Sequence, residues 1–116
     1  MSDIFAYRDP SPPAAPAGPL TGHSLAIQET LSVRGWPTRG GSPALAGYVA
    51  LEDATVVARL RAAGGRIVGT LRTNEFGFGP DPGAAGEALA AGEVGAVLMT
   101  DILGEARLAA AAAGVF

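Results

Sequence analysis

The sequence contains no cysteine, no lysine and only one histidine. The absence of cysteine excludes disulfides, thiol chemistry and cysteine-ligated metal sites. The absence of lysine excludes a lysine base, a Schiff base and a phosphate-loop lysine. One histidine cannot build a histidine-rich metal site. We therefore expect neither a metal nor a cofactor.

Positive charge and long apolar runs are also scarce. All eight basic residues are arginine, the net charge is −3 and the isoelectric point is near 4.9. This balance argues against nucleic acid and membrane surfaces as partners. No apolar run reaches the roughly 18 residues of a membrane-spanning helix, and no secretory leader opens the chain, so we expect a cytoplasmic protein. With 48% hydrophobic and 16% charged residues, the 116 residues should form one folded domain at most.

Residues 52–79 contain the clearest secondary-structure pattern. Apolar residues at three- and four-residue spacing predict an amphipathic helix over Asp53–Ala63. Glu52 and Asp53 are expected in its first turn, where the helix dipole favours acidic residues. Two glycines end the helix, and the apolar run Arg66–Leu71 follows as a predicted buried strand. A helix that leads through a tight turn into such a strand is half of a parallel α/β unit.

The remaining pattern completes an α/β fold with a small, predominantly parallel sheet and flanking helices. Gly95–Met99 is a second candidate for a buried strand, and we expect it in the same sheet as Arg66–Leu71. The other predicted elements are two strands, Ser24–Gln28 and Leu31–Val33, and two helices, Ala84–Ala91 and Glu105–Ala113.

Residues 1–19 differ in composition from the rest of the chain, with five prolines among alanines. Because proline fixes φ and disfavours helix in the preceding residue, we expect an extended arm and not a packed element. It is either a loose tail or an arm laid across a neighbouring subunit through Phe5 and Tyr7. The predicted folded domain is then residues 20–116.

Two segments carry a resemblance to a known family. DATVVARLRAAGGRIVG at 53–69 and TNEFGFG at 73–79 resemble the amidase signature family, amide hydrolases that use a Ser–cis-Ser–Lys triad. The similarity covers nearly all of the chain after residue 18 and corresponds to about the N-terminal quarter of such an enzyme. The resemblance implies a truncated amidase-like α/β core that lacks most of the substrate pocket.

The resemblance also places non-catalytic residues at the triad positions. Ile27, Gln28 and Glu29 align with the family's VKD, so Gln28 stands where the catalytic lysine would be. A glutamine amide cannot accept a proton as a neutral amine does, and we interpret Gln28 as a structural hydrogen-bonding residue. MTDILGEARLA aligns with GTD-x-GGS-[IV]-R, which puts Glu105 in the place of the nucleophilic serine. A carboxylate there is also favoured simply by its position at a helix start. The loop of the cis-serine is shortened and filled by Gly83–Gly86.

These substitutions favour a non-catalytic amidase-like module that acts in binding or assembly. Its partner would be a second copy of the chain or another protein such as an amidase. We expect a homodimer, because an exposed strand edge and the alanine-rich helix Glu105–Ala113 need to be covered.

The alternative hypothesis is an amide hydrolase of reduced or different chemistry, or one completed by a partner chain. Its candidate acids are Glu29, Asp101 and Glu105, with His23 as the base. They could converge because active sites in parallel α/β sheets lie at the carboxyl ends of the strands. Against this, Asp101 is also a typical capping residue, and a single histidine such as His23 is commonly a surface residue.

Overall fold

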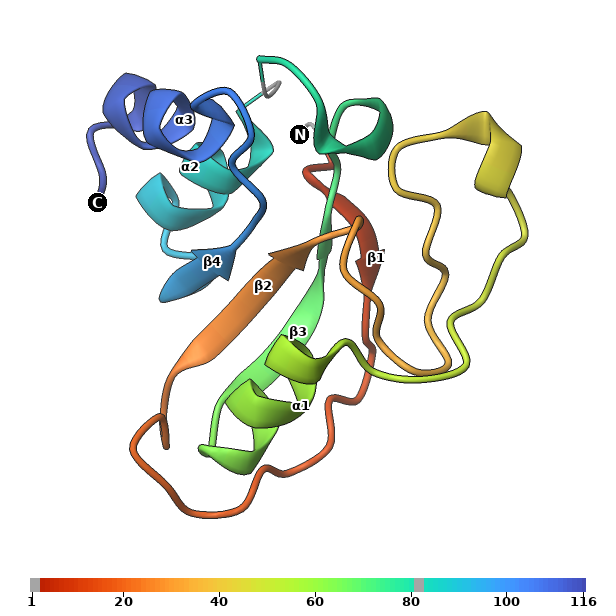
Figure 1. Ribbon diagram of the computed structural model, residues 1–116. Coiled ribbons are helices and arrows are strands. Elements are labelled where there is room, and N and C mark those ends of the chain that lie inside the picture. The colour runs from red at the N-terminus through yellow and green to blue at the C-terminus, as the bar shows by residue number, and fades with distance from the viewer. Residues whose placement is uncertain (1–2, 81–82) are drawn as a thin grey trace.

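The computed structural model describes residues 3–80 and 83–116, and its centre is a four-stranded sheet in the order β1-β3-β2-β4 (Figure 1). The strands are β1 (Phe5–Arg8), β2 (Ser24–Gln28), β3 (Arg66–Leu71) and β4 (Ala96–Leu98). The α-helices are α1 (Thr55–Ala62), α2 (Ala84–Ala90) and α3 (Glu105–Ala113), and short 3-10 helices form at Pro43–Leu45 and Glu75–Gly77.

The arrangement of the sheet confirms the predicted fold class. β2 pairs in parallel with both β3 and β4, whereas β1 runs antiparallel along β3. The two strands expected to share a sheet, Arg66–Leu71 and the one within Gly95–Met99, do so with β2 between them. Because α1 connects β2 to β3 and α2 connects β3 to β4, the parallel part is built from two βαβ crossovers.

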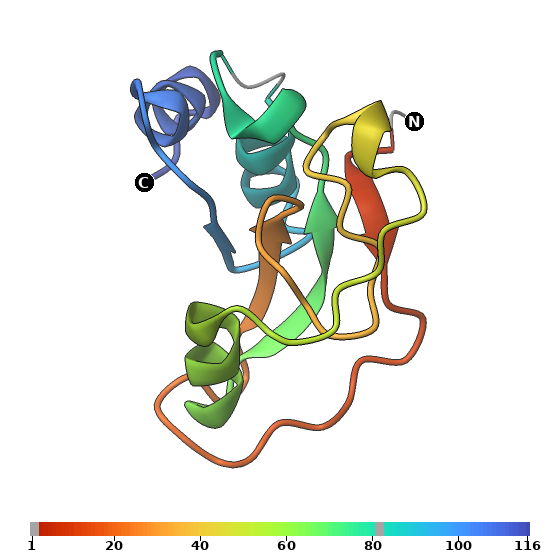
Figure 2. The same ribbon diagram turned by 45° about the vertical axis from the view of Figure 1, so that its right-hand side comes forward.

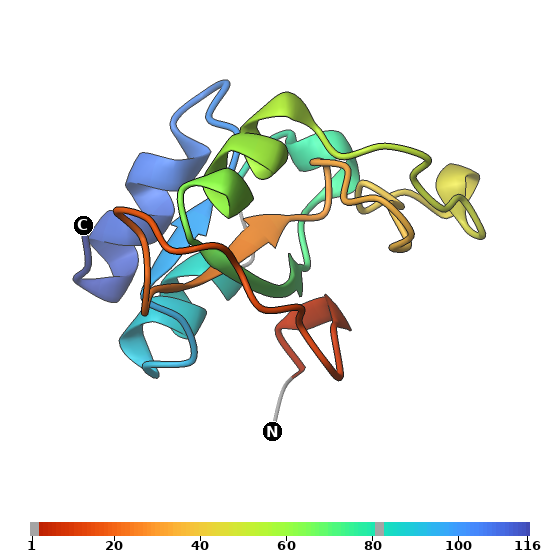
Figure 3. The ribbon, with the colours of Figure 1, turned by 90° about the horizontal axis from the view of Figure 1, so that it is seen from below.

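Helices cover both faces of the sheet, and each face has its own apolar core. Leu25 and Ile27 of β2 pack on the side of α1, where Val57 is fully buried. Ala26 lies between them on the other face, in the core that also contains Ala88 of α2. Figure 3 shows α1 and α2 on opposite sides of the strands, and Figure 2 shows α3 beside α2. The alternation along β2 is the period of two expected of a strand buried on both faces.

Two predictions about strands are wrong. Residues 31–33 form no strand, and Val33 is instead buried in a loop that packs under α1. β4 is shorter than Gly95–Met99 and its residues are exposed or half-exposed, not buried. The reason is its place in the sheet, since β4 is an edge strand whose second edge has no neighbour among the described residues.

The start of α1 also differs from the prediction. The helix begins at Thr55, so its first turn holds no acidic residue. Asp53 lies just outside and accepts the backbone N–H of Arg34, and its carboxylate pairs with Arg61 at 3.0 Å. The carboxylate therefore joins the helix to the preceding loop, a contact between residues distant in sequence. α3 has the predicted bounds, and α2 ends one residue early.

The expectation that residues 1–19 stay unpacked is wrong for β1. Phe5 is 4% exposed and belongs to the same core as Leu71. Tyr7 packs against Trp36, with ring centroids 5.0 Å apart. β1 thus covers the outer edge of β3, which would otherwise present unpaired backbone groups. The proline-rich stretch after β1 forms neither helix nor strand and leads around the molecule to β2 (Figure 3).

Candidate functional site

Gln28, the residue at the predicted lysine position, ends β2 and is 3% exposed. Its Nε2 donates to Thr73 Oγ1 at 2.8 Å. Its Oε1 accepts from Thr30 Oγ1 at 2.9 Å and from both the backbone N (3.1 Å) and the Oγ1 (2.7 Å) of Thr100. The amide thereby joins the ends of β2 and β3 to the loop after β4. A Cβ on Gly77 would lie 3.2 Å from both amide atoms, so glycine is what lets that backbone pass so close.

Glu105, the residue at the predicted serine position, is the first residue of α3 and is 2% exposed. Its Oε1 accepts the backbone N–H groups of Ile102 and Leu103, each at 2.7 Å, and its Oε2 accepts that of Gly79 at 3.0 Å. These bonds, that of Leu103 foremost, lower the pKa of the Glu105 carboxyl despite its burial. The side chain therefore stays ionised and points back into its own backbone.

Asp101 binds backbone groups of the same loop, which precedes α3. Its carboxylate accepts the backbone N–H groups of Gly104 (2.6 Å) and Arg107 (3.3 Å), as a capping residue does at the start of a helix. The Arg107 guanidinium binds the same carboxylate at 3.0 Å and 3.2 Å. This hydrogen bond to Arg107 is the main reason why the pKa of Asp101 falls to about 2. The Asp101 carboxyl is therefore ionised at neutral pH.

The segment Glu75–Gly79 links the two triad positions. Gly77 passes beside the Gln28 amide, and two residues later the N–H of Gly79 binds Glu105. Phe78, between the two glycines, points outward and is 59% exposed. Phe76, just before Gly77, also points outward and is 54% exposed. Phe76 has φ +54°, a conformation that non-glycine residues rarely adopt. The turn thus keeps two glycine backbones inside and two aromatic side chains outside.

The short connection at the predicted cis-serine loop leads directly into α2. Gly83 has φ +97° and precedes the helix, and Ala84, Ala85 and Gly86 form its buried first turn. Asp81 and Pro82 lie outside the described residues. Among the described residues there is no cis peptide bond.

The remaining predicted site residues do not meet. His23 is exposed and precedes β2, whereas Gln28 ends it, which puts the two roughly 16 Å apart along the strand. The carboxylates of Asp101 and Glu105 lie in the loop at the Gln28 end. Glu29 is buried but lines a separate cavity beside β1. The structure therefore does not bring a histidine base to these acids.

Sequence reasoning missed most of the partners of the two central side chains. Thr73 and Gly79 belong to the TNEFGFG segment, and Thr100 belongs to the segment that aligns with GTD. Their place in these two family segments was the only feature of the sequence that could have indicated them as partners. Thr30 carries no local signal of its role.

Within residues 3–80 and 83–116, no group of three or more His, Cys, Asp or Glu side chains is placed to hold a metal ion. None of the helices in those ranges is long and apolar enough to cross a membrane.

Comparisons with known proteins agree on one family. The family model described as Amidase matches residues 6–115. A glutamyl-tRNA(Gln) amidotransferase subunit from Natronomonas pharaonis is 40% identical over an alignment of 120 positions, which covers 84% of this chain and 28% of that protein. The corresponding protein of Bordetella petrii is 47% identical over 66 residues, 57% of this chain and 13% of that protein. This chain therefore spans about a quarter or less of the length of these relatives.

Solved structures give the same result for the fold. The crystal structure of a glutamyl-tRNA(Gln) amidotransferase subunit from Thermotoga maritima superposes with a TM-score of 0.70 at 25% identity, over 81% of this chain and 26% of that one. A chain of a vestigial protein complex that reveals the evolutionary origins of an s-triazine catabolic enzyme superposes with a TM-score of 0.59 at 31% identity. That match covers 67% of this chain and 22% of the other.

Proposed function

We propose that this chain, which belongs to the amidase family, does not hydrolyse amides itself and acts in the cytoplasm as a binding or assembly module. The observation that carries the proposal is the state of the Glu105 carboxylate. It is buried, ionised and bound by three backbone N–H groups at the position where the resemblance places the nucleophile.

The chemistry of the two triad positions supports this proposal. A nucleophile must present a lone pair to a substrate, and a base must take up its proton. The oxygens of Glu105 are turned to N–H donors of their own loop, and the Gln28 amide accepts hydrogen bonds but not a proton at neutral pH. Each side chain instead joins segments distant in sequence, which is a structural task.

The surface over this region supports a role in protein contacts. Four apolar side chains are exposed around the loop that holds Glu105. We call them the apolar rim: Phe78 (59% exposed), Ile102 (57%), Leu103 (64%) and Leu108 (61%). Exposed apolar side chains that lie near one another in this way are typical of protein-binding surfaces. The relatives are subunits by name, and a structural neighbour comes from a complex, so a protein partner is the natural ligand.

We propose a homodimer or a complex with a larger amidase-family protein as the assembled form. It would cover the apolar rim and the edge of β4 that has no neighbour among the described residues, with a total interface of at least about 1,000 Å². The first experiment is light scattering of the purified chain at micromolar concentration, alone and with candidate amidase-family partners. Leu103→Asp should weaken the assembly, while Leu51→Asp, which alters a side chain 80% exposed elsewhere, should not.

The second experiment tests the absence of catalysis. The purified protein is incubated with simple amides beside Glu105→Ala and a control, Glu52→Ala, at an exposed glutamate before α1. We expect no hydrolysis by any of the three. Hydrolysis by the unaltered chain that Glu105→Ala abolishes and Glu52→Ala retains would refute the non-catalytic assignment. A monomer in every mixture would refute the assembly role.

A further inference from the structure

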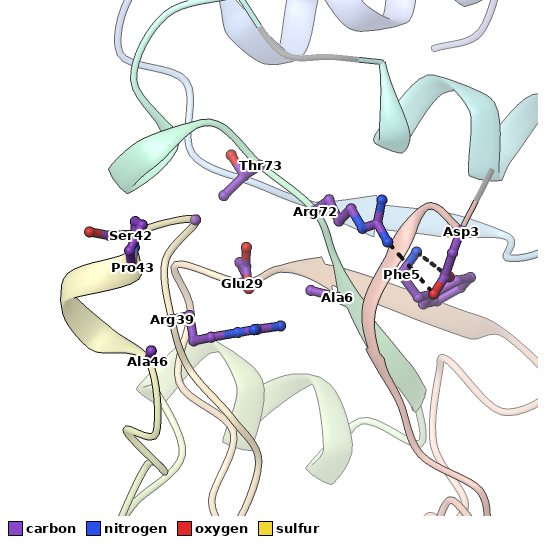
Figure 4. A pocket seen from close by; sticks show the side chains of 11 residues that line it. Asp3, Phe5, Ala6, Glu29, Arg39, Ser42, Pro43, Ala46, Arg72 and Thr73 are labelled. Carbon is purple, nitrogen blue, oxygen red and sulfur yellow. Dashed lines mark hydrogen bonds and ion pairs between the residues drawn. The ribbon is translucent and has the colours of Figure 1, made fainter.

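A cavity lies beside β1 and is separate from the Gln28 and Glu105 positions. Its volume is about 510 Å³, within the range of roughly 300–1,000 Å³ usual for small-molecule sites. β1 forms one wall, the loop after Thr38 forms the opposite one, and the residues that follow β2 and β3 form the floor (Figure 4). The carboxyl ends of adjacent parallel strands are where open α/β sheets bind ligands.

Glu29 supplies a buried carboxylate to this cavity. The residue is 6% exposed, and its burial raises the pKa of the carboxyl above the usual value. The guanidinium groups of Arg39 and Arg72 and the backbone N–H groups of Gly41 and Thr73 act in the opposite direction. A carboxylate has about four acceptor positions, so two remain after these N–H groups.

Two arginines bring positive charge to the same space. Figure 4 shows the Arg39 side chain extending across the cavity below Glu29. Among the residues that the structure describes, the Arg39 guanidinium acts electrostatically on the Glu29 carboxyl, without a hydrogen bond or a close ion pair to it. Arg72 pairs with Asp3 at 3.8 Å, and both side chains are more than half exposed, so this pair holds Arg72 weakly. Both guanidinium groups therefore keep N–H donors that a ligand carboxylate in the cavity could accept.

Hydrogen bonds and a close backbone approach hold the wall that carries Arg39. Ser42 is 3% exposed, donates to Glu75 Oε2 at 3.0 Å and accepts the N–H of Ala44. Gly41 has φ +71°, and a Cβ there would lie 2.5 Å from the backbone oxygen of Asn74. These contacts hold this wall of the cavity in place without a ligand.

We propose that this cavity binds a small organic carboxylate that also carries a hydroxyl or ammonium group. Arg39 and Arg72 bind the carboxylate, since a guanidinium offers paired N–H donors that match its two oxygens. Glu29 accepts a hydrogen bond from the hydroxyl or ammonium group. The site does not depend on the assembly role proposed above, because neither the apolar rim nor Glu105 lines it.

The test is an NMR titration of the ¹⁵N-labelled protein with four probes of matched size. Glycolate and glycine carry both groups, acetate has only the carboxylate, and methylammonium has only the cation. We expect saturable shifts of the Gly41 and Thr73 amides with glycolate or glycine, with a Kd on the order of millimolar for so few atoms. Acetate should bind several-fold more weakly, and methylammonium should not saturate.

Single substitutions test the role of each charged residue in ligand binding. Arg39→Gln and Arg72→Gln should each weaken glycolate binding by about tenfold, the loss of one charge-assisted contact. Arg66→Gln, an exposed arginine at the opposite end of β3, is the control and should bind as the unaltered chain does. Glu29→Gln should bind acetate normally and lose the preference for glycolate or glycine. If that variant fails to fold, the comparison of glycolate with acetate on the unaltered protein still tests Glu29.

Three results would overturn the proposal. The first is the absence of any saturable shift with glycolate and glycine. The second is equal affinity for acetate, glycolate and glycine, which would remove Glu29 from the site. The third is a loss of affinity in Arg66→Gln as large as in Arg39→Gln, which would mean that net charge alone drives the binding.

Discussion

Restoring lysine at the position of Gln28 should destabilise this protein. In the structure, the Gln28 Oε1 is an acceptor for the backbone N–H of Thr100 and for the hydroxyls of Thr30 and Thr100. A lysine ammonium has three donors and no acceptor. The two hydroxyls can rotate away, and the ammonium can replace Nε2 as the donor to Thr73. The Thr100 N–H cannot rotate and would lose its partner.

The expected size of the effect follows from two losses. A buried N–H without an acceptor costs about 1–3 kcal/mol. The ammonium would replace a residue that is 3% exposed. If burial lowers the lysine pKa by about two units, the charged form is disfavoured by a further ~2.7 kcal/mol. The sum for Gln28→Lys is about 4–6 kcal/mol, a large part of the roughly 5–15 kcal/mol that stabilises a typical domain.

Urea unfolding measures this change, with the fluorescence of Trp36 as the signal because it is the single tryptophan and is 6% exposed. Gln28→Glu is the matched control. It keeps two acceptor oxygens, and the Thr73 hydroxyl can rotate to donate to one of them, so its loss at neutral pH should be smaller than that of Gln28→Lys. A Gln28→Lys variant within about 0.5 kcal/mol of the unaltered chain would refute the assigned hydrogen-bond network.

Three further outcomes follow from the structure. The pKa of Asp101 is about 2, below the ordinary value of 3.8, so its stabilisation is present above pH 4 and is lost as the pH falls toward 2. Arg107→Gln should flatten the measured dependence of unfolding free energy on pH in that window. Phe5→Ala should cost about 3–5 kcal/mol in urea unfolding, since the ring is 4% exposed, and an unchanged midpoint would mean that β1 does not pack. Gly86→Ala should cost about 1–3 kcal/mol, because the new Cβ would lie 2.6 Å from a side chain of α3. In the same assay Gly95→Ala, with its nearest contact at 3.5 Å, should cost less.

Local pattern in the sequence was sufficient for much of the fold. The bounds of β3 and α3 were predicted correctly, and α1 and α2 within two residues, because apolar periodicity and glycine stops act over a few neighbouring residues. The same segments carried the family resemblance, and with it the placement of Gln28 and Glu105 at two triad positions. What a residue type excludes, such as proton uptake by a glutamine amide, also needs no structure.

Tertiary structure decided how those side chains are used. The Gly79 N–H that binds Glu105 is 26 residues away in sequence, and Thr100 is 72 residues from Gln28, so no local pattern could pair them. The order of strands put β4 at an exposed edge and β1 on the edge of β3, against the expectation for both. It also separated His23 from the acids by the length of β2. The local apolar pattern determines which residues tend to be buried. The βαβ crossovers and the strand register determine which side chains meet, and the chemistry of a site depends on which side chains meet.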